Sequence, residues 1–171
     1  MYTIARELAV TVLTIEDPVE IKEADFIQLQ VNETAEMDYE ALVKVGLRHR
    51  PDVFIIGEIR DTVTAQAAVR AALSGHLVLT TVHAQSAGGA IPRLTELGVP
   101  LVQLRQVLTG SCYQRLIPRL QDGPAVLLDI LAGDQLWQAA KTTTERWRRT
   151  LEEAGKERTI SMATVQQFRE G

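Results

Sequence analysis

The sequence is poor in cysteine and has no long hydrophobic run. Cys112 is the only cysteine among 171 residues, which excludes an internal disulfide and a zinc cluster built from several cysteines. A single cysteine also favours a reducing compartment. No stretch approaches the roughly 18 consecutive apolar residues of a membrane-spanning helix, and residues 1–7 contain no basic region leading into an apolar one. We therefore expect a cytoplasmic protein that is neither secreted nor inserted into a membrane.

The sequence also lacks an excess of positive charge. Its 18 basic and 22 acidic side chains give a net charge of −4, which disfavours direct binding to nucleic acid. Arg146, Arg148 and Arg149 form a local basic spot, which we interpret as a solvated helix face. With 46% hydrophobic and 23% charged residues, the composition is that of an ordinary folded domain.

Short β-like runs alternate with longer helical patterns along the chain. This alternation predicts an α/β fold in which helices cover a parallel sheet. No second core is expected after residue 85, and Gly155 is predicted to divide a charged tail into two amphipathic helices. The predicted strands are 10–15, 27–31, 52–57, 77–82 and 125–131, and the predicted helices are 39–50, 62–74, 86–97, 100–108 and two within 142–171.

Acidic residues follow two predicted strands at the point where each strand ends. Glu16 and Asp17 follow the first strand, and Glu58 follows Gly57 at the end of an almost wholly apolar one. The carboxyl ends of parallel strands form the edge at which α/β sheets bind ligands. In P-loop nucleotide hydrolases, an acid there holds magnesium, directly or through water, or orients the attacking water. The alternative is structural: the first two acids form an Asp-Pro turn, and Glu58 caps the next helix, although Asp61 lies closer to that helix.

Two histidines bracket the strand predicted at 77–82. His76 and His83 lie an odd number of residues apart, so in a regular strand their side chains are on opposite faces and cannot share a metal ion. The sequence therefore predicts no zinc site. An imidazole at the carboxyl end of a strand can donate a hydrogen bond to a phosphate oxygen or hold a carboxylate-bound water. The alternative for His83 is an ordinary surface histidine.

Three segments occur in a fixed order and resemble the motifs of a known family. Residues 14–20 read Thr-Ile-Glu-Asp-Pro-Val-Glu, residues 50–61 end on Gly-Glu-Ile-Arg-Asp after an apolar run, and residues 75–84 carry both histidines. In this order they resemble the Asp box, Walker B motif and His box of the secretion ATPase superfamily. Its members are the hexameric motors of type II secretion, type IV pili and competence pseudopili. Residues 114–116 also resemble the family's later Gln-Arg-Leu segment.

The resemblance implies a fold and a set of functional residues. The fold is a partial RecA-like P-loop ATPase domain over residues 1–131, followed by a helical C-terminal tail over residues 132–171. ATP and Mg²⁺ are the implied cofactors, and the choice of general base between the two catalytic glutamates stays open. The implied catalytic residues are Glu16, Glu58 and His83, the implied nucleotide-binding residues are Asp17, Arg60 and His76, and Glu58 is the implied Mg²⁺ ligand, directly or through water.

The resemblance also implies partners and a place in the cell. It predicts a homo-hexamer that works at the inner face of the cytoplasmic membrane through an inner-membrane platform protein. Such a motor powers assembly of a pilus-like or pseudopilus fibre, for competence DNA uptake or type II secretion. The four-cysteine zinc module that many type II secretion members carry is absent, which favours another branch. The competence and pilus branches stay open.

One family motif is missing from the sequence. Nothing reads as Gly-x-x-x-x-Gly-Lys-[Ser/Thr], the loop whose backbone amides and lysine hold nucleotide phosphates. Residues 1–8 resemble the middle of the helix that follows this loop in the family, so we expect a fragment that begins just downstream. Such a fragment is expected to be inactive alone. The alternative function is a catalytically inactive interaction and oligomerisation module of the same fold.

Overall fold

The computed structural model describes residues 7, 10–120, 123–139 and 143–169. The chain separates into two compact units, one formed by residues 1–83 with 94–107 and the other by residues 84–93 with 108–171. The domain boundary between residues 131 and 132 stays a prediction. Most of the segment that resembles the helix after a phosphate loop lies outside the described residues. Within the described part, no helix is long and apolar enough to cross a membrane.

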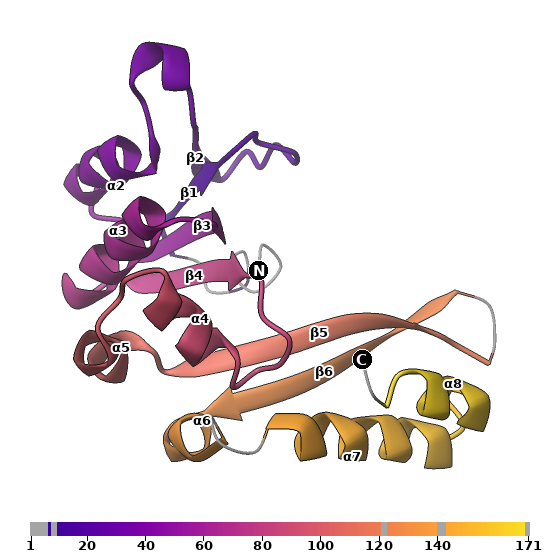
Figure 1. Cartoon of the computed structure of the whole chain (residues 1–171). Coiled ribbons are helices and arrows are strands. Elements are labelled where there is room, and N and C mark those ends of the chain that lie inside the picture. Colours follow the sequence, from indigo (N-terminus) through magenta and orange to yellow (C-terminus); the bar gives the residue numbers. More distant parts are fainter. Residues whose placement is uncertain (1–6, 8–9, 121–122, 140–142, 170–171) are drawn as a thin grey trace. The chain divides into compact units, whose positions relative to one another are not determined.

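The first unit is built on a four-stranded parallel sheet, which confirms the α/β fold class (Figure 1). The strand order is β2-β1-β3-β4. From β1 the chain passes to β2 on one side of β1 and then to β3 on the other side. The position between β1 and β3 is therefore a topological switch point. Ligands of open α/β sheets bind at such a point, outside the carboxyl ends of the strands. The strands are β1 (Val12–Glu16), β2 (Phe26–Gln30), β3 (Val53–Ile59) and β4 (Leu77–Val82).

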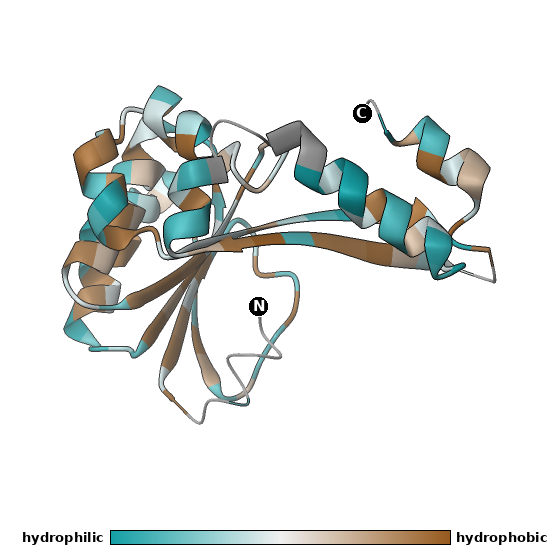
Figure 2. Cartoon of the chain, turned by 90° about the horizontal axis from the view of Figure 1, so that it is seen from below, coloured by the Kyte–Doolittle hydropathy of each residue, from teal (hydrophilic) through white to brown (hydrophobic). Residues whose placement is uncertain are grey.

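The two central strands are buried because both of their faces are apolar. All of β1 and most of β3 is buried, as is usual for strands inside a parallel sheet, and Figure 2 shows these strands as mostly hydrophobic. On one face, the ring of Phe54 packs so closely on Gly46 that a Cβ there would lie 2.7 Å from it. On the other face, Val12, Val53 and Ile55 form a separate cluster.

Two helices of the first unit begin at aspartate caps. Asp38 precedes α2 (Tyr39–Arg48) and Asp61 precedes α3 (Thr62–Leu73), and each carboxylate accepts a backbone N–H of the first turn, at 2.8 and 2.7 Å. Such caps satisfy amides that have no partner inside the helix. Because Asp61 is the cap of α3, the helix-capping alternative for Glu58 is wrong.

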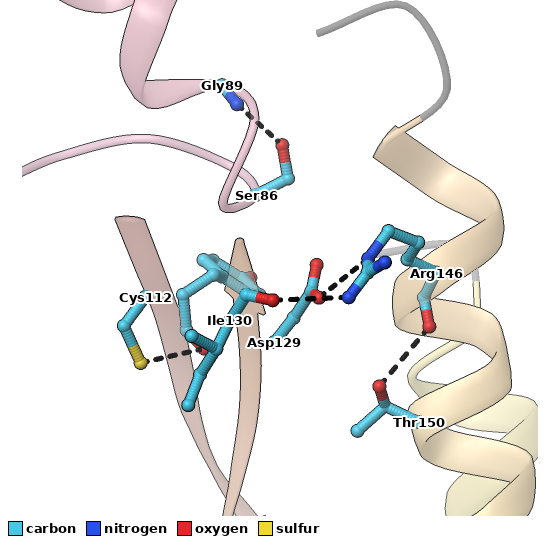
Figure 3. A network of polar contacts seen from close by, with 8 residues as sticks. Ser86, Gly89, Cys112, Asp129, Ile130, Arg146 and Thr150 are labelled. Carbon is cyan, nitrogen blue, oxygen red and sulfur yellow. Dashed lines mark hydrogen bonds and ion pairs between the residues drawn. The ribbon is translucent and has the colours of Figure 1, made fainter. Parts of the chain in front are cut away.

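Shorter helices lie between these elements and before the strand at residue 110. The helix predicted at 86–97 begins later, because the hydroxyl of Ser86 accepts the N–H of Gly89 at 3.1 Å and forms a turn there (Figure 3). The additional elements are η1 (Glu33–Ala35), α4 (Ala90–Glu96) and α5 (Leu101–Val107).

The second unit is an antiparallel hairpin packed against C-terminal helices. Its elements are β5 (Gly110–Pro118), β6 (Pro124–Ala132), α6 (Asp134–Ala139), α7 (Thr143–Lys156) and α8 (Met162–Gln167). Burial alternates strictly along β6, so one face of the hairpin is covered. The expectation of no second core is therefore wrong, because alternate strand residues and the apolar stripe of α7 bury one another. This core contains Ile117, Ala125, Leu127, Trp147, Leu151, Ala154, Ile160 and Val165.

A polar contact fastens α7 to β6 within this second unit. Arg146 extends from α7, and its Nε donates to Oδ1 of Asp129 at 3.1 Å while its Nη2 donates to the carbonyl of Ile130 at 3.2 Å (Figure 3). Asp129 is only 2% exposed. The interpretation of the basic spot as a simply solvated face is thus wrong for Arg146, which compensates a buried charge.

The tail forms two helices as predicted, α7 and α8, but the break begins after Lys156 and not at Gly155. Helix α7 continues through it to Lys156, and the chain turns at Arg158, whose φ is 57°. A Cβ at Gly155 would lie 2.8 Å from Val165. The glycine therefore allows α7 and the segment around α8 to approach closely, and it does not end the helix.

Candidate functional site

The candidate site is centred on Glu58, near the carboxyl end of β3. Nε of Arg60 donates to its Oε2 at 2.7 Å, and Nε2 of His83 lies 2.8 Å from its Oε1. The carboxylate raises the pKa of the Arg60 guanidinium further, through the hydrogen bond first and the charge second. Three residues implied by the family resemblance are thus brought together. The side chains of Arg60 and His83 are 66% and 90% exposed, so both side chains are free to move toward a ligand.

The backbone before Glu58 is fixed by a contact from β4. The hydroxyl of Thr81 donates to the carbonyl of Gly57 at 2.6 Å. The pairing of β3 with β4 shifts register between Ile56 and Ile59, so the regular ladder is interrupted at this point. The threonine hydroxyl supplies a hydrogen bond to a carbonyl beside the irregularity, and it holds the strand end that carries Glu58.

Glu16 lies at the carboxyl end of β1, on the other side of the switch point. The residue is 8% exposed. Its Oε1 accepts two hydrogen bonds, from Oγ1 of Thr14 at 2.6 Å and from Nε2 of Gln28 at 3.1 Å. Asp17 follows it and is exposed. The two acids that follow strands in the sequence, Glu16 and Glu58, therefore sit on neighbouring strands at the same edge of the sheet.

Gly57 keeps the space between these two strand ends open. A Cβ built on it would lie 3.5 Å from the carbonyl oxygen of Ile15, 3.7 Å from Cα of Glu16 and 3.8 Å from the hydroxyl of Tyr39. The strand ends thus approach closely, and a tyrosine from the first turn of α2 reaches the same place. This is the edge at which the topology predicts ligand binding.

Tyr39 is a residue of this site that the sequence reasoning missed. Its pKa is raised, first by burial and then by the negative charge of Asp17, with smaller contributions in the same direction from Glu58 and Glu16 against an opposing one from Arg60. The phenol is therefore a neutral hydrogen-bond donor among acids. Its position directly after the capping Asp38 was the available signal, since a cap fixes where the first helical turn begins.

His76 does not join the acids. It directly precedes the six-residue strand β4, so it lies at the amino end of the sheet, about 20 Å from the carboxyl edge at the usual rise per residue. Its Nδ1 lies 3.2 Å from the carbonyl of Ala71, and its ring meets Phe54 edge-on at 5.2 Å between centroids. Both contacts are structural, and a nucleotide-binding role for His76 stays a prediction without support from this geometry.

The acids present fit a magnesium ion only in part. Within the described ranges, no group of three or more His, Cys, Asp or Glu side chains is arranged to hold a metal ion by itself. Both oxygens of Glu58 already contact side chains, Arg60 and His83. Direct coordination by Glu58 would break one of these contacts, whereas coordination through water would not. The site therefore fits an ion that takes most of its ligands from phosphates and water.

Known proteins resemble this chain over nearly its whole length. The family described as "Type II/IV secretion system protein" matches residues 1–166. The chain is 53% identical over 131 residues to competence protein ComGA of Streptococcus pneumoniae, covering 76% of the chain and 40% of that protein. It is 41% identical over 141 residues to the type IV pilus assembly ATPase TfpB of Acinetobacter baylyi, covering 81% of the chain and 24% of that protein.

A solved structure of a pilus motor is also similar to this chain. The crystal structure of the pilus retraction motor PilT with bound ADP matches 96% of this chain and 56% of its own, at 28% identity and a TM-score of 0.78. The chain thus spans less than two thirds of the length of each of these proteins. The match to the family nevertheless extends over almost every residue, so this chain belongs to the type II/IV secretion system protein family.

Proposed function

We propose that this chain is the C-terminal ATPase-domain part of a hexameric motor that hydrolyses ATP. The observation that carries the proposal is the clustering of Glu58 with His83 and Arg60 at the switch point, with Glu16 on the neighbouring strand. Acids at this position act on the attacking water or on the metal ion in P-loop hydrolases. The family membership and the names of the pilus and competence relatives support the same function.

The residues of the site have different roles, which follow from their charge and exposure. Bound Mg²⁺ would offset phosphate charge and align the reacting groups. Glu58 acts through water, because its two oxygens are held by Arg60 and His83. Arg60 and His83 are exposed hydrogen-bond donors that can turn to phosphate oxygens, and Asp17 contributes negative charge near Arg60. Glu16 accepts the proton of the attacking water.

The motor powers assembly of a pilus-like or pseudopilus fibre. The competence relatives support DNA uptake as its task, and the type II secretion relatives, which are almost as similar, support secretion. In this proposal the hexamer is cytoplasmic and works at the inner face of the membrane through an inner-membrane platform protein. It makes no direct contact with nucleic acid. This chain alone, without a phosphate loop in its sequence, releases no phosphate from ATP above background.

Replacement of Glu58 tests the proposal in a full-length protein that carries this region and a phosphate loop. Glu58→Gln keeps the shape of the side chain and removes its charge, so we expect ATP binding to persist while magnesium-dependent phosphate release falls at least about 100-fold. The exposed Glu153 in the second unit supplies the matched control, Glu153→Gln, with unchanged turnover. Unchanged turnover in Glu58→Gln would contradict the assignment.

The alternative function is an inactive interaction module of the same fold. It is favoured by one observation, that both oxygens of Glu58 already contact protein side chains, Arg60 and His83. ATP binding by the full-length protein separates the two functions. Magnesium-dependent binding supports the motor, whereas its absence supports the module.

A further inference from the structure

Thr14, Gln28 and Glu16 share one face of the sheet. Thr14 and Gln28 are register partners across β1 and β2, and Glu16 lies two residues beyond Thr14 on the same strand. Since side chains alternate between faces, all three project to the same side, opposite to Leu13. Thr14 is fully buried. A completely buried threonine hydroxyl in an apolar strand needs a partner, and Glu16 is that partner.

Both donors act on the same carboxylate oxygen. Oγ1 of Thr14 and Nε2 of Gln28 donate to Oε1 of Glu16, at 2.6 and 3.1 Å. Within the described residues, Oε2 has no hydrogen bond or ion-pair partner. The two oxygens of one carboxylate therefore have different environments: one is fixed by the protein, and the other is left to accept a proton or a hydrogen bond from outside.

The amide of Gln28 is itself held in place. Its Oε1 accepts the N–H of Glu23 at 2.7 Å, and its Nε2 also donates to the carbonyl of Ile21 at 2.9 Å. These two contacts fix which end of the amide faces Glu16, because the amide oxygen is already used by an N–H donor. The donor to Glu16 is thus preorganised by the loop between β1 and β2.

The arrangement differs from that of a structural buried acid. Such an acid is normally paired with a cation or has both oxygens satisfied. Among the described residues, Glu16 has no cationic partner, and its neutral donors gather on one oxygen. Neutral donors orient a carboxylate without neutralising it, so the negative charge stays available at the edge of the sheet.

We propose that Thr14 and Gln28 are positioning residues that orient Glu16 toward the reacting water. This inference rests on the proposed function. Oε2 of Glu16 accepts a proton from the water, whose oxygen bonds to the γ-phosphorus as the bond from that phosphorus to the departing ADP oxygen breaks. The proton later passes to the phosphate product. Thr14 and Gln28 do not touch the reacting atoms; they hold the acceptor in one orientation while the proton is transferred.

Thr14→Val and Thr14→Ser in the full-length protein provide the first test. Valine has the shape of threonine without the hydroxyl, so we expect kcat to fall about 10- to 100-fold while KM changes less than about twofold. Serine restores the donor and should recover most of the turnover. Affinity for a non-hydrolysable ATP analogue with Mg²⁺ and the melting temperature should be unchanged. Thr64→Val, at a buried threonine of α3, is the matched control.

Gln28→Met and a double-mutant cycle complete the test. Gln28→Met removes the donor with little change in volume, and we expect the same fall in kcat as for Thr14→Val. In a Glu16→Gln background, Thr14→Val should cause no further loss, because residues that act through one group are not additive. Should Thr14→Val prevent folding, Gln28→Met alone decides the outcome.

The outcomes separate this inference from the proposed function. An inactive wild-type motor contradicts the proposed function. An active wild type with unchanged kcat in Gln28→Met and Thr14→Val overturns the positioning role alone. An equal loss in Thr64→Val, or an undiminished effect in the Glu16→Gln background, also overturns it, because either result assigns the effect to packing.

Discussion

The hydroxyl of Tyr39 lies 3.8 Å from the position that a Cβ would take on Gly57. The two residues come from different elements, α2 and β3, and meet where β1 also ends. A methyl group at residue 57 would make only ordinary contacts there, yet it would fill the space between the strand ends. Packing and ligand access can therefore be separated experimentally at this position.

Gly57→Ala should leave the fold intact and impair the site. The nearest atoms to the new methyl group are 3.5 Å or more away and φ is not positive, so we expect the melting temperature to stay equal or rise slightly, as for other tolerated glycine replacements. Affinity for a magnesium-bound ATP analogue should fall severalfold in the full-length protein. A melting temperature and an affinity that both stay at wild-type values would show that the space is not used.

Tyr39→Phe should change how stability depends on pH at the alkaline end. The pKa of Tyr39 is raised above its ordinary value of 10.0, chiefly by burial and by Asp17. The folded state therefore keeps its proton longer than the unfolded state, and this contribution to stability, full below pH 10, is lost as pH rises through the folded pKa. Denaturant titrations of this chain should show a steeper alkaline loss for wild type than for Tyr39→Phe.

Tyrosinate absorbance in the near ultraviolet provides an independent check on the same residue. Tyr39→Phe should remove a phenol that ionises above the ordinary range. Tyr113→Phe, at a partly buried tyrosine that packs against the core of the second unit, is the control. If Tyr39→Phe removes a phenol that titrates at or below its ordinary value, the hydroxyl does not lie among the acids.

The two histidines should respond differently to replacement by alanine. His83 is highly exposed and contacts Glu58, so His83→Ala should lower turnover of the full-length protein at least about tenfold with almost no change in melting temperature. His76→Ala loses a hydrogen bond and a ring contact, so it should cost about 1 to 2 kcal/mol of stability with turnover retained. If His76→Ala lowered turnover at an unchanged melting temperature while His83→Ala left turnover unchanged, the functional histidine would be His76 and not His83.

Arg146→Leu should destabilise the second unit more than the loss of an exposed positive charge would. It leaves the carboxylate of Asp129 buried without a cation, and one oxygen of that group already has no partner in the described structure. Breaking a buried pair costs about 3 to 5 kcal/mol, and the partial exposure of Arg146 lowers our expectation to about 2 to 4 kcal/mol. Asp129→Asn in the same background should recover part of the loss in denaturant unfolding. A further loss of stability instead would show that the buried charge is not the cause.

The sequence was sufficient to predict the parallel strands and the helices between them. Strands β3 and β4 and helix α3 lie close to their predicted bounds because each is a largely apolar or alanine-rich run bounded by polar residues or glycine. The second core was missed because β6 is an almost continuous apolar run, so the sequence does not show which of its faces packs against α7. The break at Gly155 was wrong because a glycine inside a helix can serve close packing as well as termination.

The sequence also allowed only part of the candidate site to be predicted. Glu16, Glu58 and His83 follow strands in the sequence, so topology alone brings them to one edge. Thr14 and Gln28 could not be recognised, because their role depends on the register between β1 and β2, which single-sequence patterns do not give. The hydroxyl of Tyr39 lies at this edge through a tertiary contact between α2 and β3, and residue spacing in the sequence does not predict such a contact.

The side-chain amide of Gln28 links the loop between β1 and β2 to the carboxylate of Glu16. One planar group binds the backbone at Ile21 and Glu23 on one side and the carboxylate of Glu16 on the other. The loop between β1 and β2 cannot shift without carrying this amide along or breaking one of its bonds. Ile21 on this loop is 58% exposed, so a change at the loop surface would act on the hydrogen bond that holds Glu16 at the sheet edge.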